Sequence, residues 1–320
     1  AGRHAALQHG DSMNTLVPRR ARVTVKVTRP DAQGAEQALT YAFGWNEQAP
    51  DDPGHRMTIN VGQGGGQFGN AKVSIFGVNL EAMNKIARLW LEVLSPSNTD
   101  TLTIDVWDGS NFVPFFAGVI TWSAVNASGA PQVALEIEAN SAMIAMNTVA
   151  APYAQDEPVS LQAALSQILG PTGLVVEFAP SVPELPVQRA HLSGTPMDQA
   201  IALMGYFPEL TWYINLQRFL VRPVNGPLGG DPIPVNKNTG MIGYPTYSTS
   251  GVQLATLFDP RIRPGLALDI QTIFEFVNRT KWVASVLQHT LQPNTPGGQW
   301  MTQIAAQSYG SKGDGSGSET

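Results

Sequence analysis

Apolar and polar residues alternate with a period of two over most of the first 150 residues. In the segment 22–28 (RVTVKVT), Val23, Val25 and Val27 share one face, with Thr24 and Lys26 on the other. The same alternation recurs in three further segments, at residues 71–77, 101–107 and 132–139. A strand points successive side chains to opposite faces, so this pattern predicts half-buried antiparallel strands. One helix is expected to interrupt them, beginning after Asn79 as N-cap, with Ile86 and Leu89 turned inward.

The spacing changes between residues 151 and 225, where helical signals replace strict alternation. Ser160 precedes an apolar helical pattern that ends at Gly170, which predicts one capped helix. A second helix is predicted after Thr195, because Pro196 suits the first helical position and Asp198 an N-terminal turn. Flanking apolar runs predict strands, two of them joined as a hairpin near residues 215–216. A small α+β unit is therefore expected here.

Alternation returns after the Pro- and Gly-rich linker at residues 223–235. Val252, Leu254 and Leu257 are predicted to face inward on one strand, and further strands are predicted within 265–272, 282–291 and 300–307. Two β units separated by an α+β insert follow from this order. The end of the chain from residue 311 is rich in Gly and Ser, a composition typical of flexible tails.

Composition excludes several classes of protein. A formal net charge of −6 argues against a dedicated nucleic-acid binder, which needs basic surface to displace phosphate counterions. Charged residues make up only 14% of the 320 residues, which hints at large buried interfaces. There is no cysteine, and no apolar run approaches the roughly 20 residues of a membrane span. The first twelve residues lack a signal-peptide core, so we expect a protein made and used without Sec export.

Two motifs resemble functional sites but are better explained as structure. The segment 64–69 (GGGQFG) satisfies the dinucleotide-binding pattern, but a strand rather than a helix is predicted to follow it. Glu136 and Glu138 are expected on one strand face roughly 7 Å apart, a geometry that a glycosidase could use. Their alternation with apolar residues is equally typical of a solvated strand face, which we favour.

The remaining candidates are isolated. The pair Asp51–Asp52 near His55 is separated from it by Pro53–Gly54, which indicates a polar turn rather than a metal site. Arg19, Arg20 and Arg22 form a small basic cluster that we assign to a solvated strand edge. The remaining single His and Trp candidates are assigned structural roles, and they are His191, His289, Trp282 and Trp300. We therefore predict no catalytic residue, no cofactor-binding residue and no metal ligand, in a protein that is not an enzyme.

Several segments resemble the baseplate hub proteins of contractile-tailed bacteriophages. The first is residues 239–270, in which a Gly-Met-Ile-Gly-Tyr-Pro start leads to a strand and then to the corner LFDPRIRPG at 257–265. The chain resembles further segments of the family in the same order, at residues 71–89, 115–139, 192–200, 211–215 and 286–306. The resemblance covers about residues 20–307 and departs from the family at 271–282 and in the first 20 residues. Pro260, Pro264 and Gly265 predict that the corner is a stiff link between strands.

The resemblance implies an architecture and an assembly. It implies a mainly β fold with two tail-tube-like β-barrel domains plus a small α+β domain. Three chains would supply six tube-like domains, so the implied protein is a homotrimeric hub that joins a hexameric tail tube protein to a central spike protein. Baseplate wedge and tape-measure proteins are further implied partners, and DNA would pass through the lumen without specific binding. The implied location is the virion, in the phage tail baseplate, after assembly in the host cytoplasm.

Two alternative functions remain beside this one, a tail-associated peptidoglycan hydrolase and a hub or tube component of a related contractile injection system. The predicted organisation has five parts: a flexible N-terminal arm at 1–20, a first tube-like β domain at 21–150, a small α+β domain at 151–225, a second tube-like β domain at 226–309 and a flexible tail at 310–320.

Overall fold

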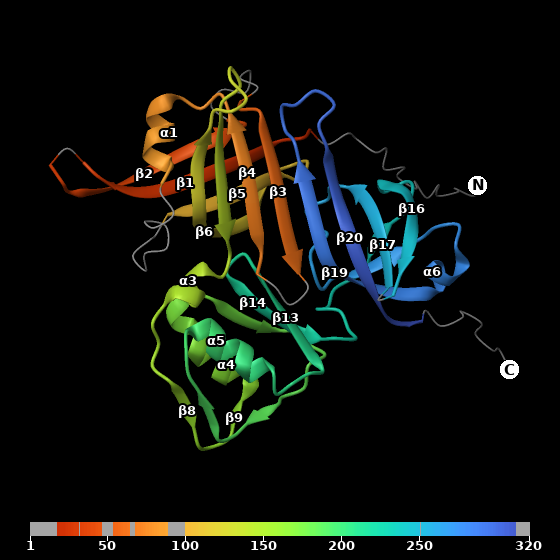
Figure 1. Cartoon of the computed structure of the whole chain (residues 1–320). Helices are drawn as coiled ribbons and strands as arrows, with labels where there is room; N and C mark the ends of the chain where they lie inside the picture. The colour runs from red at the N-terminus through yellow and green to blue at the C-terminus, as the bar shows by residue number, and fades with distance from the viewer. Residues whose placement is uncertain are drawn as a thin grey trace, which may run out of the picture.

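A computed structural model describes residues 18–31, 33–46, 54–64, 68–88, 100–249 and 251–311. The chain forms one large twisted sheet with a smaller helical unit packed at one end of it (Figure 1). The prediction of a mainly β chain is confirmed. The predicted flexible arm and tail lie largely outside the described residues, as do Asp51, Asp52 and Leu89.

The first part of the sheet is antiparallel and follows the predicted alternation. Its strands are β1 (Ala21–Pro30), β2 (Glu36–Gly44), β3 (Met57–Gly64), β4 (Asn70–Phe76), β5 (Thr101–Trp107), β6 (Phe112–Asn126) and β7 (Ala134–Asn140). The inward side chains of β1, including Val23 and Val25, are buried, as are the inward side chains of β3 to β7. These side chains make one hydrophobic core with Met83 and Ile86 of helix α1 (Leu80–Ile86). Asn79 caps α1 as predicted, because its side chain accepts a hydrogen bond from the Ala82 amide.

The second part of the sheet has a separate core. Its strands are β15 (Ile233–Val235), β16 (Met241–Ser248), β17 (Gly251–Leu257), β18 (Ala267–Ile270), β19 (Thr280–Leu291) and β20 (Trp300–Ser311). A short helix, α6 (Glu275–Arg279), occupies the segment that departs from the family pattern. Trp282 is buried in this core and donates its indole N–H to the carbonyl of Val277 at 2.8 Å. The structural role predicted for Trp282 is therefore confirmed.

The unit between β7 and β15 combines short strands with three helices. Its helical elements are α3 (Met143–Asn147), α4 (Leu161–Leu169), the 3₁₀ turn η1 (Gly170–Thr172) and α5 (Pro196–Met204), and its strands are β8 (Tyr153–Gln155), β9 (Val159–Ser160), β10 (Val175–Phe178), β11 (Pro186–Val187), β12 (Ala190–Leu192), β13 (Leu210–Asn215) and β14 (Arg218–Pro223). Thr195 and Asp198 form a reciprocal capping box at the start of α5, as the sequence predicts. Gly170 keeps a right-handed conformation and continues into η1, and the left-handed turn comes at Gly173.

The two parts of the large sheet are joined edge to edge through β3 and β19. The strand order is β16-β17-β20-β19-β3-β4-β7-β6-β5-β1-β2, with β18 beside β19 and β15 beside β18. In the described residues no pairing joins β2 back to another strand of the path, so the sheet is open. Two tail-tube-like β-barrel domains were expected, and the described residues contain no closed barrel. One continuous sheet instead curves around two successive cores.

One inward assignment in the second part is also wrong. Leu257 is 46% exposed, whereas Thr256 is buried. A strand alternates strictly, so Val252 and Leu254 share their face with Thr256 and not with Leu257. Thr256 is therefore buried at the position where hydrophobicity alone would predict the neighbouring Leu257.

Candidate assembly surfaces

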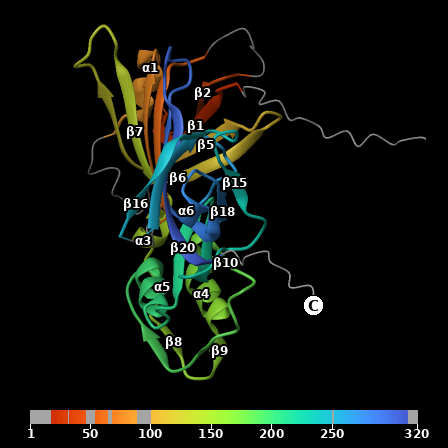
Figure 2. The same cartoon turned by 90° about the vertical axis from the view of Figure 1, so that its right-hand side faces the viewer.

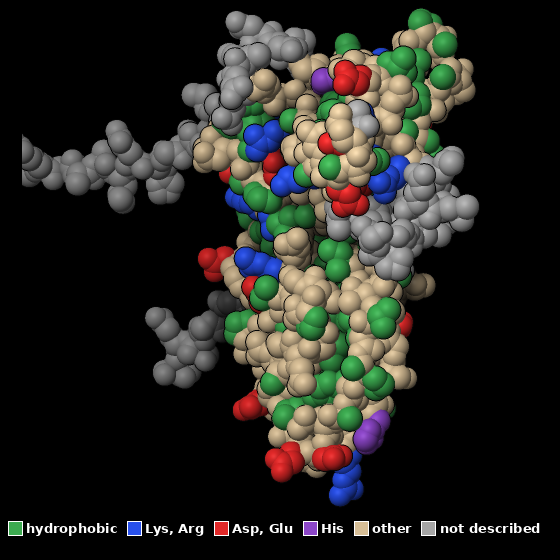
Figure 3. Space-filling model, turned by 90° about the vertical axis from the view of Figure 1, so that its left-hand side faces the viewer, with side chains coloured by type: hydrophobic (Ala, Val, Ile, Leu, Met, Phe, Trp, Pro, Cys, Tyr) green, Lys and Arg blue, Asp and Glu red, His purple; other side chains and the backbone are tan. Residues whose placement is uncertain are grey.

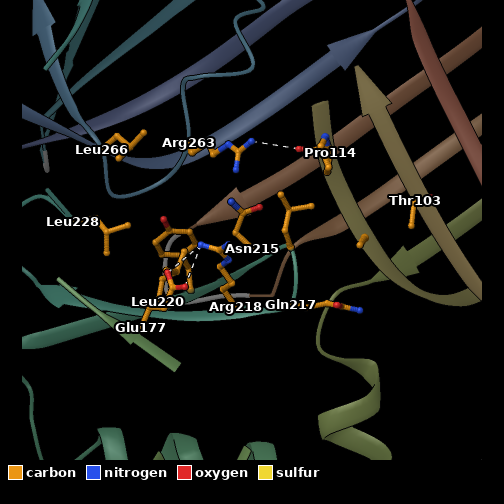
Figure 4. A pocket seen from close by; sticks show the side chains of 13 residues that line it. Thr103, Pro114, Glu177, Asn215, Gln217, Arg218, Leu220, Leu228, Arg263 and Leu266 are labelled. Atoms are coloured by element: carbon orange, nitrogen blue, oxygen red, sulfur yellow. Dashed lines mark hydrogen bonds and ion pairs between the residues drawn. The ribbon is translucent and has the colours of Figure 1, made fainter. Parts of the chain in front are cut away.

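A cleft of about 570 Å³ opens where the large sheet meets the helical unit and the corner at 257–265 (Figure 4). One wall comes from the sheet (Thr103, Pro114 and Ala117), another from the β13–β14 hairpin, and a third from the corner. Leu216 and Gln217 form the hairpin turn with φ of 47° and 63°, a left-handed conformation that is unusual for residues other than glycine. The predicted hairpin turn at residues 215–216 is thus confirmed to within one residue.

Arginines and one carboxylate give this cleft its charge. Arg218 of β14 is paired with Glu177 of β10 at 3.1 Å. Arg263 of the corner donates to the Pro114 carbonyl at 3.3 Å, which ties the corner to β6 across the cleft. Burial lowers the pKa of the Arg263 guanidinium. No carboxylate of the described residues lies within ion-pair distance of Arg263, so backbone oxygens alone partner this cation.

The corner itself is a junction rather than a free turn. Its Asp259 carboxylate binds the side chain of Arg261 at 2.6 Å and the Arg261 amide at 2.9 Å. Ile262 points into the second core. Gly265 has φ of 79°, and a Cβ there would lie 3.2 Å from both Tyr213 and Arg222. The corner does link two strands, β17 and β18, as predicted, and its stiffness stays a prediction. The close approach of the helical unit explains why glycine stands at its end.

Gly265 also connects the linker to the second part of the sheet. Its carbonyl accepts from the Leu228 amide at 2.7 Å, and its own amide donates to the Ala284 carbonyl at 2.7 Å. The buried guanidinium of Arg222 donates to three linker carbonyls, those of Pro223, Val224 and Gly226. Burial lowers the pKa of Arg222 and raises that of the neighbouring Tyr213 phenol. The linker is therefore tied down at several points along its length.

Both ends of the strand order are open edges. In the described part of the chain, β2 pairs only with β1, and β16 pairs only with β17. The β1–β2 hairpin projects from the body, and β16 lies at the opposite side of the sheet (Figures 1 and 2). An open edge offers unpaired backbone groups to another chain, and native proteins usually protect such edges. Pro245 and an irregular register between Ile242 and Thr246 interrupt β16 in this way.

An exposed aromatic patch accompanies the β16 edge. Tyr244, Tyr247 and Phe276 are each about 60% exposed, with values of 61%, 58% and 62%. Phe274 joins them, with its ring 6.1 Å from Tyr244 and 6.0 Å from Tyr247. We call these four residues the edge patch. Tyr and Phe are enriched at protein interfaces, so the edge patch is suited to contact with another protein.

His289 lies buried at the seam between the two parts of the sheet. Its Nδ1 is 2.9 Å from the Thr302 hydroxyl, and its ring packs edge-to-face on Phe115 and Phe258. Burial lowers the pKa of His289 to about 3, so the ring is neutral near pH 7. The predicted hydrogen-bonded structural role of this histidine is confirmed, whereas His191 lies exposed on β12.

The other sequence candidates do not converge on one place. Glu138 of β7 pairs with Lys72 at 2.9 Å, and Glu136 accepts a hydrogen bond from Asn126. Both carboxylates therefore have partners on the solvent face of the sheet. Residues 65–67 of the glycine-rich motif lie outside the described residues, and the segment joins β3 to β4 with a strand after it. The described residues contain no cluster of three or more His, Cys, Asp or Glu side chains placed to hold a metal.

The basic cluster is more engaged than a solvated edge. Arg22 pairs with Asp105 at 3.0 Å, and Arg20 lies over the Trp45 ring at 4.6 Å. Arg19 donates to the Gly298 carbonyl at 2.9 Å, which links the start of the sheet to the β19–β20 turn. The arginines thus hold together segments that are far apart in the sequence. Trp300 is half-buried and packs on Phe258, again a structural role.

Sequence reasoning missed Arg263 of the cleft, the buried Arg222 and one buried ion pair. Arg222 and Arg263 carry no sequence pattern that distinguishes them, because they bind backbone carbonyls and not charged side chains. Arg29 is paired with Asp100 at 2.8 Å below α1, and both side chains are buried. An arginine at the end of a strand gives no signal of burial. Only the position of Arg263 between two prolines could have drawn attention to it.

Within the described residues, no helix combines the length and apolar character that a membrane crossing requires. Among the curated proteins, none matches this chain.

Solved structures with a similar fold are phage tail proteins and a secretion-system protein. The tail protein from Neisseria meningitidis MC58 aligns with a TM-score of 0.56 at 9% identity, over 90% of this chain and 96% of that one. The 43 kDa tail protein of prophage MuSo2 from Shewanella oneidensis aligns with a TM-score of 0.55 at 10% identity, over 89% and 97%. The c3393 protein of E. coli, a type VI secretion system component similar to T4 tail proteins gp27 and gp5, gives 0.54 at 10% identity, over 79% and 73%.

These structural likenesses concern the fold alone, because the identities are so low. The sequence itself carries the family assignment. The pattern of the baseplate hub gp41 family matches residues 77–294, which is more than half of the chain and spans parts of both halves of the sheet and the whole helical unit. The chain therefore belongs to the baseplate hub gp41 family.

Proposed function

We propose that this protein is a structural hub of a contractile-type tail, in which three copies form a ring between a six-fold tail tube and a three-fold spike. Membership of the baseplate hub family supports a role in the tail and a place in the virion. The finer assignments of tube, spike, wedge and tape-measure proteins as partners are part of the proposal. So is assembly in the host cytoplasm.

The observation that carries the ring is one sheet with two cores and two open ends. Each chain contributes two curved β units, so three chains contribute six, the number a six-fold tube requires. A head-to-tail contact between the β2 edge of one copy and the β16 edge of the next would close without leaving an exposed strand. The edge patch would then be buried in that contact.

We also propose that the hub has no catalytic activity and that DNA passes through its lumen without specific binding. The two carboxylates that best resemble an acid–base pair, Glu136 and Glu138, are each held by a neighbouring side chain. The peptidoglycan hydrolase remains the alternative that would use them. A clearing zone on host peptidoglycan that disappears in the Glu138→Gln variant would favour that alternative over the hub.

A second candidate is a hub or tube component of a related contractile injection system. This candidate is supported by the fold similarity to c3393, a component of the type VI secretion system. Both functions share the trimeric ring, and they differ in whether DNA passes through it.

The decisive experiment is a cryo-electron microscopy structure of tails assembled with this chain. We expect three copies in one ring below the tube, with the two β units of each copy at alternating positions around it. Six copies per ring, or copies located outside the central axis, would contradict the proposed hub. Single substitutions in the edge patch, such as Tyr247→Ser, should reduce incorporation into tails, whereas Tyr206→Ser, at a 70% exposed site on the helical unit, should not.

A further inference from the structure

We infer that the solvent face of strands β17, β20, β19 and β3 lines the channel through which DNA slides. This inference rests on the proposed hub function and goes beyond it, because it assigns one face of one sheet to the channel. The assignment comes from the chemistry of the side chains on that face and from the register of the strands.

The face in question is the side of the sheet that points away from the two cores. On β17, β20, β19 and β3, the alternate positions within 253–257, 301–305, 286–290 and 58–62 point this way. Their side chains are Gln, Asn, Thr, Ala, Leu, Met, Val and Gly. Across these described positions there is no Asp, Glu, Lys or Arg. Charged residues make up 14% of this chain and are mostly exposed in folded proteins, so a solvent face without any is unusual.

One row of this face is a ladder of uncharged amides. The strand register places Gln303 opposite Gln288, Gln288 opposite Gly62, Gly62 opposite Asn70, and Asn70 opposite Asn140. A Cβ at Gly62 would lie 2.9 Å from the Asn70 amide oxygen and 3.1 Å from that of Gln288. The missing side chain therefore leaves room for the two neighbouring amides to lie across the strand. A hollow of about 420 Å³ beside Gln253, Gln288 and Gln303 lies on the same face.

Next to this face, on β4 and β7, the charged side chains are one ion pair and one further carboxylate, which leaves a net charge of −1 there. Lys72 of β4 and Glu138 of β7 form an ion pair at 2.9 Å, and Glu136 accepts from Asn126. The opposite end of the molecule differs, because charged side chains gather over the face that carries the β1–β2 hairpin and α1 (Figure 3). The low charge content of the chain is thus not spread evenly over its surface.

An uncharged, hydrogen-bonding face suits a moving polyanion. A row of cations would bind phosphates by releasing counterions and would hold the DNA in place. A row of unpaired carboxylates would repel it. Amide and hydroxyl groups exchange hydrogen bonds with water in either direction, so DNA can pass without a fixed site. A subunit contact would instead favour an apolar centre with aromatic residues, as found at the edge patch.

The test places a cation at the centre of the face. Gln303 is exposed on β20, and Gln303→Arg in a trimer would set three arginines at one level of the channel. Tails are assembled in cells on a phage whose own hub gene is deleted, with this chain supplied in its place. DNA release from purified particles is then triggered in vitro and timed at low and high salt. Matched controls are Gln303→Asn at the same position and Gln167→Arg, at an exposed position of α4.

We expect normal numbers of Gln303→Arg particles and release that is roughly tenfold slower at low salt, with the delay shrinking at high salt because phosphate contacts are screened. Both controls should release DNA at the unmodified rate. Unchanged release with Gln303→Arg would overturn the inference by placing this face outside the channel. Loss of particles with Gln303→Arg alone, while its melting temperature is unchanged, would overturn it by making the face a subunit contact. If the unmodified chain never enters tails, the hub function fails instead.

Discussion

The two parts of the large sheet bury different kinds of polar group, charged in the first part and neutral in the second. The first part buries a full ion pair, Arg29 with Asp100, and Arg88 approaches the same carboxylate at 3.7 Å. The second part and the seam beside it bury neutral groups instead, with His289 on Thr302 as the clearest case. The outer faces differ in the same sense, since Arg22 and Asp105 pair on the first part while amides cover the second. Charged pairs therefore concentrate on the first part of the sheet, and uncharged amides cover the face of the second.

The largest effect is expected from breaking the ion pair of the first part. Asp100→Asn leaves the Arg29 guanidinium buried without its counter-charge, so the free energy of unfolding should fall by about 3–5 kcal/mol. Denaturant unfolding of the purified chain measures this. The exposed pair Lys72–Glu138 provides the control, because Glu138→Gln should cost less than about 1 kcal/mol. Equal losses for the two variants would mean that burial does not distinguish the two pairs.

The next effect is an acid sensitivity located at the seam. The folded-state pKa of His289 is lowered to about 3, below its unfolded value near 6.5, so the unfolded state binds the proton first as pH falls. Stability from the neutral ring is complete above pH 6.5 and is lost progressively down to pH 3, by roughly 3 kcal/mol at pH 4. Melting curves between pH 7 and pH 4 should show this loss, and His289→Gln should show much less. An identical pH profile in both proteins would exclude His289 as the source.

A smaller effect is expected at the corner between the two parts. Gly265→Ala introduces a Cβ at φ of 79° and within 3.2 Å of Tyr213 and Arg222, so it should cost about 1–3 kcal/mol. Gly297→Ala is the matched control, because Gly297 has φ of 68° and open space around it. The control isolates the backbone cost, of about 1 kcal/mol. If both variants lose the same stability, the close approach of the helical unit to the corner contributes nothing.

The smallest effect on the isolated chain is expected at the edge patch. Tyr247→Ser removes a 58% exposed ring, so the free energy of unfolding should change by less than about 0.5 kcal/mol. The same variant should weaken self-association, measured by analytical ultracentrifugation at high protein concentration. A large loss of stability in the monomer would mean that the patch supports the fold rather than a contact.

Alternation predicts the strands of this fold well because it depends only on neighbours along the chain. Caps are equally local, which is why Asn79, Ser160 and Thr195 were assigned correctly. The pairing of β3 with β19 is different, because it joins residues more than 200 positions apart and merges the two parts into one continuous sheet. Leu257 was predicted to be buried because it is hydrophobic, but its position in the strand alternation places it on the exposed face. Arg222 and Arg263 were missed because their partners are backbone carbonyls, which no residue type in the sequence indicates.

The junction at Gly265 also has a mechanical consequence. The Leu228 amide, Gly265 and the Ala284 carbonyl lie in series, so two short hydrogen bonds splice the linker to the second part of the sheet. A force that separates the helical unit from the sheet would act on these two hydrogen bonds before it extends the linker. Arg222 keeps the linker compact, because its guanidinium donates to three linker carbonyls. Tension between the helical unit and the sheet would reach the sheet through the corner as well as through the covalent chain. The corner, through its two prolines and the backbone hydrogen bonds of Gly265, thus becomes a second path for force.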